Sequence, residues 1–460
     1  MAKYQQYEQY KESGVEWLEE IPSHWELSKL RYMFSFGRGL TITKADLLDT
    51  GVPCVSYGEV HSKYGFEVDP KKHYLKCVDE GYLQSSPYAL LTKGDLVFAD
   101  TSEDIEGSGN FTQLITDDLV FAGYHTVIAR PFDRQCSRFY AYLMDSKEIR
   151  TQIRHMVKGV KVFSITQSIL KGVEIWLPSL DERETIANFL DHETAQIDTL
   201  IDKQQTLIQL LKEKRQAVIS HAVTKGLNPD APMKDSGVEW LGEVPEHWVV
   251  SPLKLYIDTR KGVAFKSADF TDLGVRVVKA SDIKEKTIRQ SDVFLPVYFS
   301  ETYPKAILSE GDIVISTVGS TPDVKNSAVG QIGMVPVELD GSLLNQNTVV
   351  FTPRNNMLEN LFLFYLIQTD VYRDHLDLNA HGTANQASLN VSDMLNFTFA
   401  RPSFKEQSEI SEHIIEVNSS FDALERNCLT AIQLMQERRT ALISAAVTGK
   451  IDVRGWVESE

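Results

Sequence analysis

Two segments of this chain have nearly the same sequence, although they lie 223 residues apart. SGVEWLEEIPSHW begins at Ser13, and SGVEWLGEVPEHW begins at Ser236. Similar pairs recur in the same order along the chain: GDLVFA (94–99) with GDIVIS (311–316), LPSLDERETI (177–186) with RPSFKEQSEI (401–410), and QLLKEKRQAVISHAVTKG (209–226) with QLMQERRTALISAAVTGK (433–450). A repeat of about 220 residues is too long for a solenoid. The sequence therefore predicts two copies of one domain, each with an appended element, related by a pseudo-twofold axis.

The two copies differ most in their middle parts. Between Trp25 and Trp176, and between Trp248 and Ala400, only short patches agree. Loops that vary on a shared scaffold commonly carry function. We therefore expect one scaffold that presents two different binding surfaces.

Composition places the chain among ordinary folded proteins. Hydrophobic residues make up 42% and charged residues 24% of its 460 residues, which is enough for more than one buried core. No apolar run approaches the roughly 18 residues of a membrane span, and residues 1–10 are polar, so we expect a cytoplasmic protein without membrane contact. The cysteines show no CxxC spacing, which predicts reduced core thiols and no zinc site. They are Cys54, Cys77, Cys136 and Cys428.

The net charge of −17 at first argues against a nucleic-acid partner, because phosphate-binding proteins usually carry a basic excess. Three short segments, 1–24, 226–247 and 455–460, together account for nine of these negative charges. The divergent regions are therefore close to neutral, and each of them can present a basic face.

A long helix is predicted after each divergent region. Each helix would begin after a Pro-Ser pair, at 178–179 or 402–403, and would stop near Gly226 or Gly449. Seam residues recur at alternating spacings of three and four for about five heptads without Gly or Pro. The predicted seam positions are 186, 190, 193, 197, 200, 204, 208, 211, 215, 218 and 222 in the first helix and 410, 414, 417, 421, 424, 428, 432, 435, 439, 442 and 446 in the second.

The two helices are expected to pack on each other, since their lengths agree and both seams are interrupted by an arginine, Arg215 or Arg439. Antiparallel packing would place one globular domain at each end of a rod of about 65 Å. The predicted fold class is thus α+β, with two mixed α/β domains separated by two long antiparallel coiled-coil helices in a pseudo-twofold repeat. The predicted divisions are a connecting segment (1–24), a first mixed domain (25–177), a central helix (178–225), a linker (226–247), a second mixed domain (248–401), a distal helix (402–454) and a tail (455–460).

Within the mixed domains, strands are predicted at 95–99, 120–130, 312–316 and 348–352, and helices at 139–156 and 361–376. No catalytic constellation stands out. The chain lacks a phosphate-binding P-loop, which excludes ATP-driven work by this chain, and the string Asn228–Pro232 lacks the second proline and the aromatic residue of an amino-methyltransferase. We interpret Asp282–Lys284 as a solvated turn rather than half of a nuclease site, and His24 and His247 as parts of packed turns.

These features together resemble the specificity (S) subunit of type I restriction-modification systems. The resemblance rests on the SGVEWL…IP…HW openings, the GDxV strands, the Pro-Ser-x-x-Glu entry to each helix and the Arg-x-Ala-x-Ile-Ser-x-Ala-Val-Thr exit. It covers essentially the whole chain in the order of that family. The chain departs from the pattern at Arg183, where the family usually has the glutamine seen at Gln407. The family's Gly-Thr-x-x-Gln stretch is clear at 382–386 but blurred at 159–164.

The resemblance implies a non-catalytic subunit that reads double-stranded DNA. Each target recognition domain would read one half of an asymmetric bipartite site, and the helices would set the gap between the halves. Two modification subunits would dock on the helical regions, bring S-adenosylmethionine and methylate an adenine in each half-site. Restriction subunits would add translocation and cleavage that depend on ATP and Mg²⁺. No cofactor is expected in this chain itself.

Polar loop residues of the first domain are candidate DNA contacts, because base edges are read by forks and amides while cations and hydroxyls hold phosphates. These candidates are Arg38, Ser56, Tyr57, Thr101, Ser102, Tyr124, His125, Lys158 and Lys161. Internal hydrogen bonding is the alternative role for each of them.

The second domain carries its own candidates, of which we expect Gln346 and Asn385 to read bases and Lys261 to hold a phosphate. The full set is Arg260, Lys261, Lys266, Thr317, Ser320, Thr321, Asn345, Gln346, Asn347, His381, Thr383, Asn385 and Gln386. Two other classes of protein stay open at this point. One is a coiled-coil adaptor that holds two partner proteins without reading DNA, and the other is a pair of glycan- or peptide-binding domains. An enzyme in its own right has the least support.

Overall fold

The computed structural model of the chain describes residues 4–157, 162–320, 329–354, 356–383 and 386–457. The chain forms two compact units. Unit 1 comprises Met1–Gln205 together with Leu429–Glu460, and unit 2 comprises Thr206–Cys428. Two long helices, α6 (Leu180–Lys225) and α11 (Phe404–Val447), each contribute one part to either unit.

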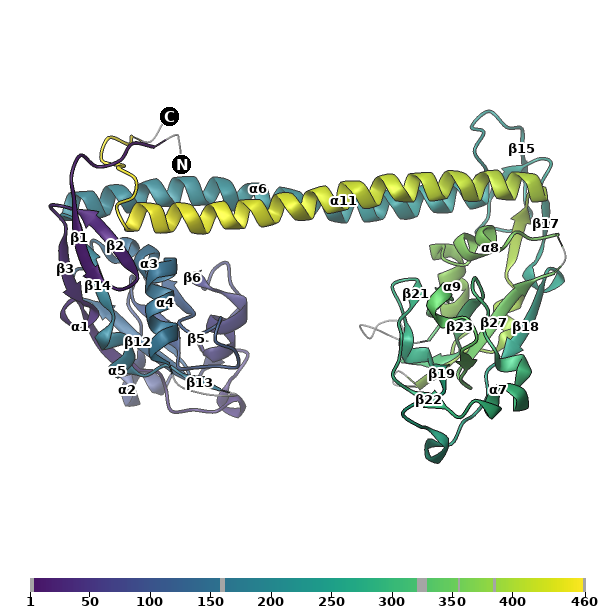
Figure 1. Ribbon diagram of the computed structural model, residues 1–460, viewed down its shortest axis with the longest axis horizontal. Coiled ribbons are helices and arrows are strands. Elements are labelled where there is room, and N and C mark those ends of the chain that lie inside the picture. Colours follow the sequence, from purple (N-terminus) through teal and green to yellow (C-terminus); the bar gives the residue numbers. More distant parts are fainter. Residues whose placement is uncertain (1–3, 158–161, 321–328, 355, 384–385, 458–460) are drawn as a thin grey trace. The chain divides into compact units, whose positions relative to one another are not determined.

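Unit 1 is built on a five-stranded sheet in the order β4-β12-β8-β10-β6 and a three-stranded sheet in the order β11-β5-β7. Of these strands, β5, β6 and β12 are labelled in Figure 1. The strands of these sheets are β4 (Phe34–Arg38), β5 (Val52–Val55), β6 (Phe66–Val68), β7 (Cys77–Val78), β8 (Leu96–Ala99), β10 (Phe111–Leu114), β11 (Phe121–Ala122) and β12 (Thr126–Pro131). Three two-stranded sheets complete the unit: β1 (Tyr10–Val15) with β2 (Leu18–Pro22), β3 (Glu26–Lys29) with β14 (Glu174–Leu177), and β9 (Thr101–Ser102) with β13 (Phe163–Ser164). The short helices of the unit are α1 (Leu30–Met33), α2 (Tyr82–Ser85), α3 (Ser137–Asp145), α4 (Lys147–Met156) and α5 (Gln167–Gly172).

Unit 2 repeats this topology with different loops. Its main sheet has the order β18-β27-β23-β25-β21-β20, and its smaller sheet has the order β22-β19-β26. The strands are β15 (Met233–Asp235), β16 (Glu243–Pro245), β17 (Val249–Pro252), β18 (Ile257–Lys261), β19 (Val275–Val278), β20 (Ile283–Lys284), β21 (Thr287–Ile288), β22 (Phe294–Leu295), β23 (Ile313–Ser316), β24 (Val318–Gly319), β25 (Ile332–Met334), β26 (Leu343–Leu344), β27 (Thr348–Pro353), β28 (His381–Thr383), β29 (Gln386–Ser388) and β30 (Thr398–Arg401). The short helices are α7 (Tyr298–Thr302), α8 (Asn360–Leu366), α9 (Asp370–Leu378) and α10 (Val391–Leu395).

The predicted long helices are confirmed, together with the signals that bound them. Ser179 Oγ accepts the amide of the third following residue at 3.4 Å, and Ser403 Oγ does the same at 3.2 Å, so each serine caps the first turn. Gly226 directly follows α6 with a φ of +80°, and Gly449 lies just beyond α11 with a φ of +75°. A left-handed residue of this kind ends a helix without the penalty that a Cβ would bring.

Within each unit, the two long helices pack along one another. In unit 2, Lys212 pairs with Glu425 at 3.3 Å and Arg215 pairs with Asp422 at 2.5 Å, so the helices run in opposite directions. In unit 1, Arg439 of α11 bonds Asp198 of α6 at 3.1 Å. The arginine that interrupts each predicted seam therefore extends its aliphatic stem across the seam and pairs its charged end with the facing helix.

The predicted seam is wrong at two positions of α6. It contained Glu193 and Leu200, whereas the structure buries Thr194 and Ile201 at 4% and 9% exposure. Leu200 is 48% exposed instead, as is its counterpart Leu424 on α11. Ile197, between these two positions, is buried at 4% exposure as predicted, so the error is local. After Leu190 and after Ile197, the next buried residue lies four positions further along rather than three.

The paired Trp and His residues are structural, as the sequence indicates. Glu182, at the start of α6, accepts Trp25 Nε1 at 3.1 Å and lies 2.9 Å from His24 Nε2. The same two contacts recur around Glu406, at the start of α11: Trp248 Nε1 donates at 3.0 Å, and His247 Nε2 lies at 3.0 Å. The repeated opening motif therefore fastens the N-terminal part of each repeat to a long helix.

Three predicted elements are interrupted in the structure. The helix expected at 139–156 is broken at Ser146, and the helix expected at 361–376 is broken at Thr369. Each of these side chains caps the helix that follows, by accepting the amide three residues on. The strand expected at 120–130 is split into β11 and β12, because the backbone turns through a left-handed His125 with a φ of +54°.

Candidate nucleic-acid interface

At one end of the main sheet in unit 1, five backbone hydrogen bonds join five chain segments into a frame, the fifth being Ile165 just after β13. The amides of residues 39, 40, 123, 100 and 165 donate to the carbonyls of residues 126, 122, 55, 125 and 100, over 2.7 to 3.1 Å. The frame thereby brings together the end of β4, the β5 exit, the β8 exit and the turn between β11 and β12. Most of the first domain's predicted contact residues lie on it.

Unit 2 has the same frame. There the amides of residues 262, 263, 345, 317 and 389 donate to the carbonyls of residues 348, 344, 278, 347 and 317, over 2.8 to 3.1 Å. Each bond has its equivalent in unit 1, in the same order. The strand β9 pairs with β13 just as β24 pairs with β29, which extends the equivalence beyond the frame.

The side chains on the two frames differ although the backbone is the same. The frame turn reads Gly123-Tyr124-His125 in unit 1 and Asn345-Gln346-Asn347 in unit 2. At the β8 exit Asp100 stands where unit 2 has Thr317, and after β5 Tyr57 stands where unit 2 has Ala280. This is the pattern expected of two surfaces with a common architecture and different ligand preferences.

In unit 1 the frame presents an aromatic and imidazole group. His125 is 61% exposed at its side chain and lies 3.2 Å from Asp100 Oδ1, and the Tyr57 amide donates to the Tyr124 carbonyl at 3.2 Å. Burial raises the pKa of Tyr57, and the nearby carboxylates of the 100–104 loop raise it further. Burial and Glu59 likewise raise the pKa of Tyr124. Both phenols therefore stay neutral hydroxyl donors at ordinary pH.

In unit 2 the frame presents amides. Gln346 and Asn347 are exposed, and Asn345 Oδ1 accepts the Gln346 amide at 2.6 Å, which fixes the turn. The β28–β29 hairpin stands beside this turn, because Thr317 connects the two through its amide and its carbonyl. His381 and Gln386 are exposed on that hairpin, and Thr383 pairs with Gln386 across it. Thr317 and Ser320 are half-buried on the neighbouring segment.

Three of the predicted contact residues have internal roles instead. Ser56 and Ser102 are buried, with 0% and 1% exposure, and Ser102 Oγ donates to the Asp104 carbonyl at 2.6 Å. The Arg260 guanidinium donates to the Ile307 carbonyl at 2.6 Å and pairs with Asp312 at 2.5 Å. Burial and charge pairing are invisible in a loop composition, so these three residues looked like surface groups. Lys158, Lys161, Thr321 and Asn385 lie outside the described residues.

Sequence reasoning missed other frame residues that the structure places beside the candidates. Lys44 is exposed in the short turn after Arg38, just as Lys266 is after Lys261. Asp100 and Lys279 lie directly at frame hydrogen bonds or next to them. Their signal was available, since residues at equivalent places of the two repeats can be compared pairwise once the repeats are aligned.

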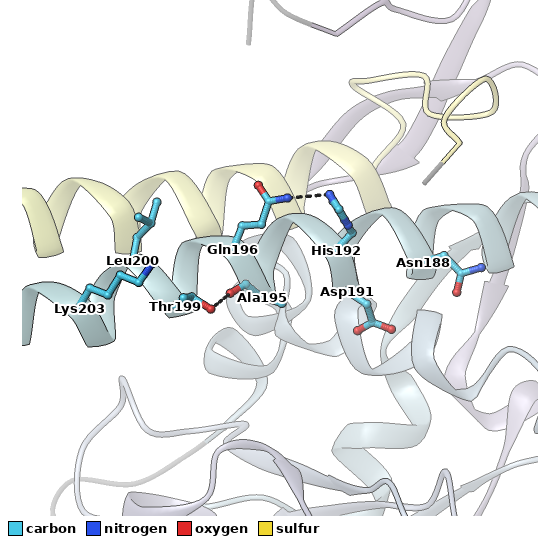
Figure 2. Close-up of a pocket in the computed structure, with 8 residues that line it drawn as sticks. All are labelled: Asn188, Asp191, His192, Ala195, Gln196, Thr199, Leu200 and Lys203. Carbon is cyan, nitrogen blue, oxygen red and sulfur yellow. Dashed lines mark hydrogen bonds between the residues drawn. The ribbon is translucent and has the colours of Figure 1, made fainter. Parts of the chain in front are cut away.

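A groove of about 840 Å³ runs along α6 in unit 1 (Figure 2). It is lined by Asn188, Asp191, His192, Ala195, Gln196, Thr199, Leu200 and Lys203. Two of its polar contacts lie within the helix: Gln196 Nε2 lies 2.7 Å from His192 Nε2, and Thr199 Oγ1 donates to the Ala195 carbonyl at 2.7 Å. Asp191 instead accepts from Arg138 Nε at 2.7 Å and from the Tyr142 hydroxyl at 2.6 Å, both on α3. Because one helix face alone lines it, the groove has the character of a docking surface rather than of a reaction centre.

Exposed leucines on the long helices recur at equivalent positions. Leu200 in unit 1 and Leu424 in unit 2 are each 48% exposed, and Leu434 in unit 1 and Leu210 in unit 2 are 59% and 54% exposed. Both pairs are separated by 224 residues, so each unit presents the same two leucines. Among the described residues there is no group of three or more His, Cys, Asp or Glu arranged to hold a metal ion. Of the described helices, none is both long and apolar enough for a membrane crossing.

Two unlike polar surfaces on one repeated frame, with matched apolar patches on paired helices, define a recognition protein with a duplicated architecture. The chain belongs to the family described as the type I restriction modification DNA specificity domain, which matches residues 22–210 and 245–434. The expected identity as a specificity subunit, the non-catalytic part of a type I system, and the expected fold class are thereby confirmed.

Individual relatives are distant in sequence. The EcoKI specificity subunit of Escherichia coli is 22% identical over 96% of this chain and 92% of its own length. The MjaVIII specificity subunit of Methanocaldococcus jannaschii is 24% identical over 68% of this chain and 70% of its own length. A chain solved in a study of complex assembly and conformational transition of the type I R-M system has a TM-score of 0.65 at 15% identity, over 94% of this chain and 99% of that one, which supports the fold.

Proposed function

We propose that this chain directs a type I complex to DNA by reading an asymmetric bipartite sequence, one half with each mixed domain. The domains are residues 25–177 and 248–401. The observation that carries this proposal is the repeated frame: five equivalent backbone hydrogen bonds hold side chains of different chemistry. A repeated backbone docks on DNA in the same way twice, while different side chains select different bases. Such a protein reads a sequence that is not a palindrome.

The proposal assigns the exposed and half-buried candidates of the frame, together with Thr383 of the β28–β29 hairpin, to the DNA surface. In the first domain these are Arg38, Tyr57, Thr101, Tyr124 and His125. In the second they are Lys261, Lys266, Thr317, Ser320, Asn345, Gln346, Asn347, His381, Thr383 and Gln386. Asn and Gln side chains offer the paired donor and acceptor that adenine presents in the major groove, which favours Gln346 and Asn347 as base readers.

The helical segments 178–225 and 402–454 set the gap between the half-sites in this proposal, and they dock two methyltransferase subunits. The relatives named above are specificity subunits of restriction enzymes, so partners of that kind belong to the same proposal. Two copies of one partner need two equivalent surfaces. The leucines at 200 and 434 in unit 1, repeated at 424 and 210 in unit 2, supply them. S-adenosylmethionine, ATP and Mg²⁺ enter with the partners, and the complex acts in the cytoplasm.

A loop exchange tests the reading role. The variant Asn345→Gly, Gln346→Tyr, Asn347→His gives the second frame the turn of the first. Methylated adenines are mapped genome-wide in cells that carry the partner subunits and either form of this chain. We expect one half of the recognised sequence to change and the other half to stay. An unchanged methylation pattern would remove this turn from the reading surface.

A second experiment tests the docking role. The double variant Leu200→Gln, Leu424→Gln removes one exposed leucine from each unit, and Leu273→Gln, at a position 84% exposed in a loop of the second domain, is the matched control. We expect the double variant to fold normally and to lose co-purification with the methyltransferase subunits, while the control retains them. Equal retention by both variants would place the docking surface elsewhere.

A further inference from the structure

Among the exposed side chains of the frame, one keeps its charge between the two units. Arg38 ends β4 and Lys261 ends β18, and these two strands occupy the same edge of their sheets. Both residues are exposed. They are equivalent by hydrogen bonding as well, because the amide after each of them donates to the first residue of β12 or β27 at 3.1 Å.

A glycine that the packing requires follows each of these cations. A Cβ on Gly39 would lie 1.9 Å from the Gly123 carbonyl oxygen, and a Cβ on Gly262 would lie 1.8 Å from the Asn345 carbonyl oxygen. Real side chains never approach so closely, so the chain here passes directly against the variable turn. The glycine thereby holds the cation at a fixed place beside the residues that differ.

A second cation follows within six residues in both units. Lys44 and Lys266 lie in short turns, which are closed by Asp46 and Asp269 respectively. The Asp46 carboxylate accepts the Thr43 amide at 2.7 Å, and the Asp269 carboxylate accepts the Lys266 amide at 3.3 Å. The two lysines lie one position apart in the alignment of the repeats. Each of them adds an exposed positive charge shortly after the cation at the strand end.

The contrast with the rest of the frame separates two roles. A residue that reads a base must differ between two domains that select different bases, whereas a residue that holds a phosphate need not. His125 and Asn347 differ, and so do the other residues of that turn. Among the exposed frame side chains, the cation at the strand end keeps its charge while the turn beside it changes.

We propose that Arg38 and Lys261 are equivalent phosphate contacts, which anchor each domain on the DNA backbone irrespective of sequence. Lys44 and Lys266 would contact neighbouring phosphates. This inference rests on the proposed function, since it concerns how the same surface meets DNA. It divides that surface into a constant backbone clamp and a variable reading turn.

The test uses the complete complex with its methyltransferase subunits and two duplexes, one with the full target and one with the half-site of the first domain scrambled. Dissociation constants are measured over a range of salt concentrations for wild type, Arg38→Gln, Lys261→Gln and the double variant. Lys72→Gln, at a side chain 74% exposed and away from the frame, is the charge-matched control. Thermal unfolding of each variant checks that the fold is retained.

Each phosphate contact contributes about 0.9 to the slope of log K against log salt concentration. We expect each single variant to lower the slope by about 0.9 and the double variant by about 1.8. Arg38→Gln should weaken binding to both duplexes by the same factor, and Lys72→Gln should leave binding unchanged. The conservative variants Arg38→Lys and Lys261→Arg should keep the wild-type slope.

Two results would overturn the inference while leaving the proposed function intact. One is a loss from Arg38→Gln on the full target only, which would make this residue a base reader. The other is an unchanged salt slope in a variant that folds. If the wild-type complex failed to discriminate between the two duplexes, the proposed function itself would fail, and the inference with it.

Discussion

Gly37 leaves the space that the Arg130 side chain fills. A Cβ on Gly37 would lie 2.8 Å from Arg130 Nη1. Arg130 crosses the sheet from β12, pairs with the buried Asp95 at 3.3 Å and donates to the carbonyls of Tyr88 and Leu90. The position of the arginine on β12 therefore depends on the absence of a side chain at the glycine on β4.

Unit 2 builds the same arrangement from the opposite strand. Arg260 stands on β18 at the place equivalent to Gly37, and it reaches Asp312 and the carbonyl of Ile307. Thr352 occupies the place equivalent to Arg130. Both domains therefore neutralise the aspartate of the Gly-Asp-x-Val strand and tie down the preceding loop, but the arginine comes from neighbouring strands.

This exchange predicts unequal losses of stability on truncation. Asp95 keeps a second partner, Arg134 at 3.0 Å, whereas Arg260 is the arginine that pairs with Asp312. We expect Arg260→Ala to cost about 3 kcal/mol and Arg130→Ala about 1–2 kcal/mol, because the first leaves a mostly buried carboxylate without its arginine. Urea denaturation measures both. Equal losses would mean that Arg134 contributes nothing to Asp95.

A reciprocal substitution tests the geometry more directly. Gly37→Arg alone places two guanidinium groups in one space and should destabilise the domain by about 1–3 kcal/mol. The double variant Gly37→Arg, Arg130→Thr reproduces the arrangement of unit 2 and should recover most of that loss. The two changes are thus strongly non-additive. A double variant no more stable than Gly37→Arg would contradict the equivalence of the two arrangements.

Elements that depend on residues close together in the sequence were predicted better than elements that depend on distant ones. The long helices were predictable to within a few residues, since Ser179 and Gly226 act on their own neighbours. The break at Ser146 was missed because apolar residues recur on both sides of it, at Met144 and Ile149, so the capping serine looks like an ordinary helical residue. The seam was misplaced at Leu200 because spacings of three and of four from Ile197 both reach an apolar residue, Leu200 or Ile201, and the pattern alone does not choose between them.

The candidate interface was predictable as a set of loops but not residue by residue. Tyr124 and His125 lie on the frame of unit 1, and Asn345–Asn347 lie at the equivalent place on the frame of unit 2. The comparison of the repeats had aligned these two turns. Arg260 was misjudged, since its partner Asp312 lies 52 residues away and the pair forms only when β18 and β23 enter one sheet. Whether a polar loop residue faces solvent depends on such long-range pairings, which composition does not report.

The glycine of each cation–glycine step gives a further prediction on stability. Gly39→Ala and Gly262→Ala force a Cβ against a main-chain oxygen, so we expect each to destabilise the protein by about 2–3 kcal/mol. Gly58→Ala is the control, because its φ is −65° and a Cβ there meets nothing within 4 Å. It should change stability by less than about 0.5 kcal/mol. Thermal unfolding decides the comparison, and a Gly39→Ala protein as stable as the control would show that the frame can open.

The cysteines should be unreactive in the folded protein. All four are free and buried, and burial raises the pKa of Cys54 and of Cys136 to about 12. At pH 8 a thiol with that pKa is thiolate in roughly one molecule in ten thousand, so attack on a disulfide reagent is slow. We expect almost no reaction of these two with Ellman's reagent in buffer and the release of four equivalents after denaturation. Rapid reaction of Cys54 in the native state would contradict the burial found here.

The N-terminal and C-terminal segments that the structure describes pair with each other within unit 1, where unit 2 has a continuous linker. Gln5 forms a β-bridge with Asp452, and the Tyr10 hydroxyl donates to the Gly449 carbonyl at 2.9 Å. In unit 2, the equivalent connection from Gly226 to β15 runs through the exposed segment 227–230. In the second repeat, a continuous stretch of chain therefore makes the connection that the first repeat makes by pairing its N-terminal and C-terminal segments.

This arrangement predicts that the chain tolerates circular permutation. A permutant with its original ends joined by a short flexible linker, and opened between Pro229 and Asp230, loses only local turn bonds such as the Asp230 amide to Asn228 Oδ1. We expect a melting temperature within a few degrees of wild type. A permutant opened between Val127 and Ile128 interrupts the buried centre of β12, and it should fail to fold. Should the first permutant unfold as readily as the second, the backbone between Gly226 and β15 would have to be a stabilising element of unit 2 rather than a simple connection.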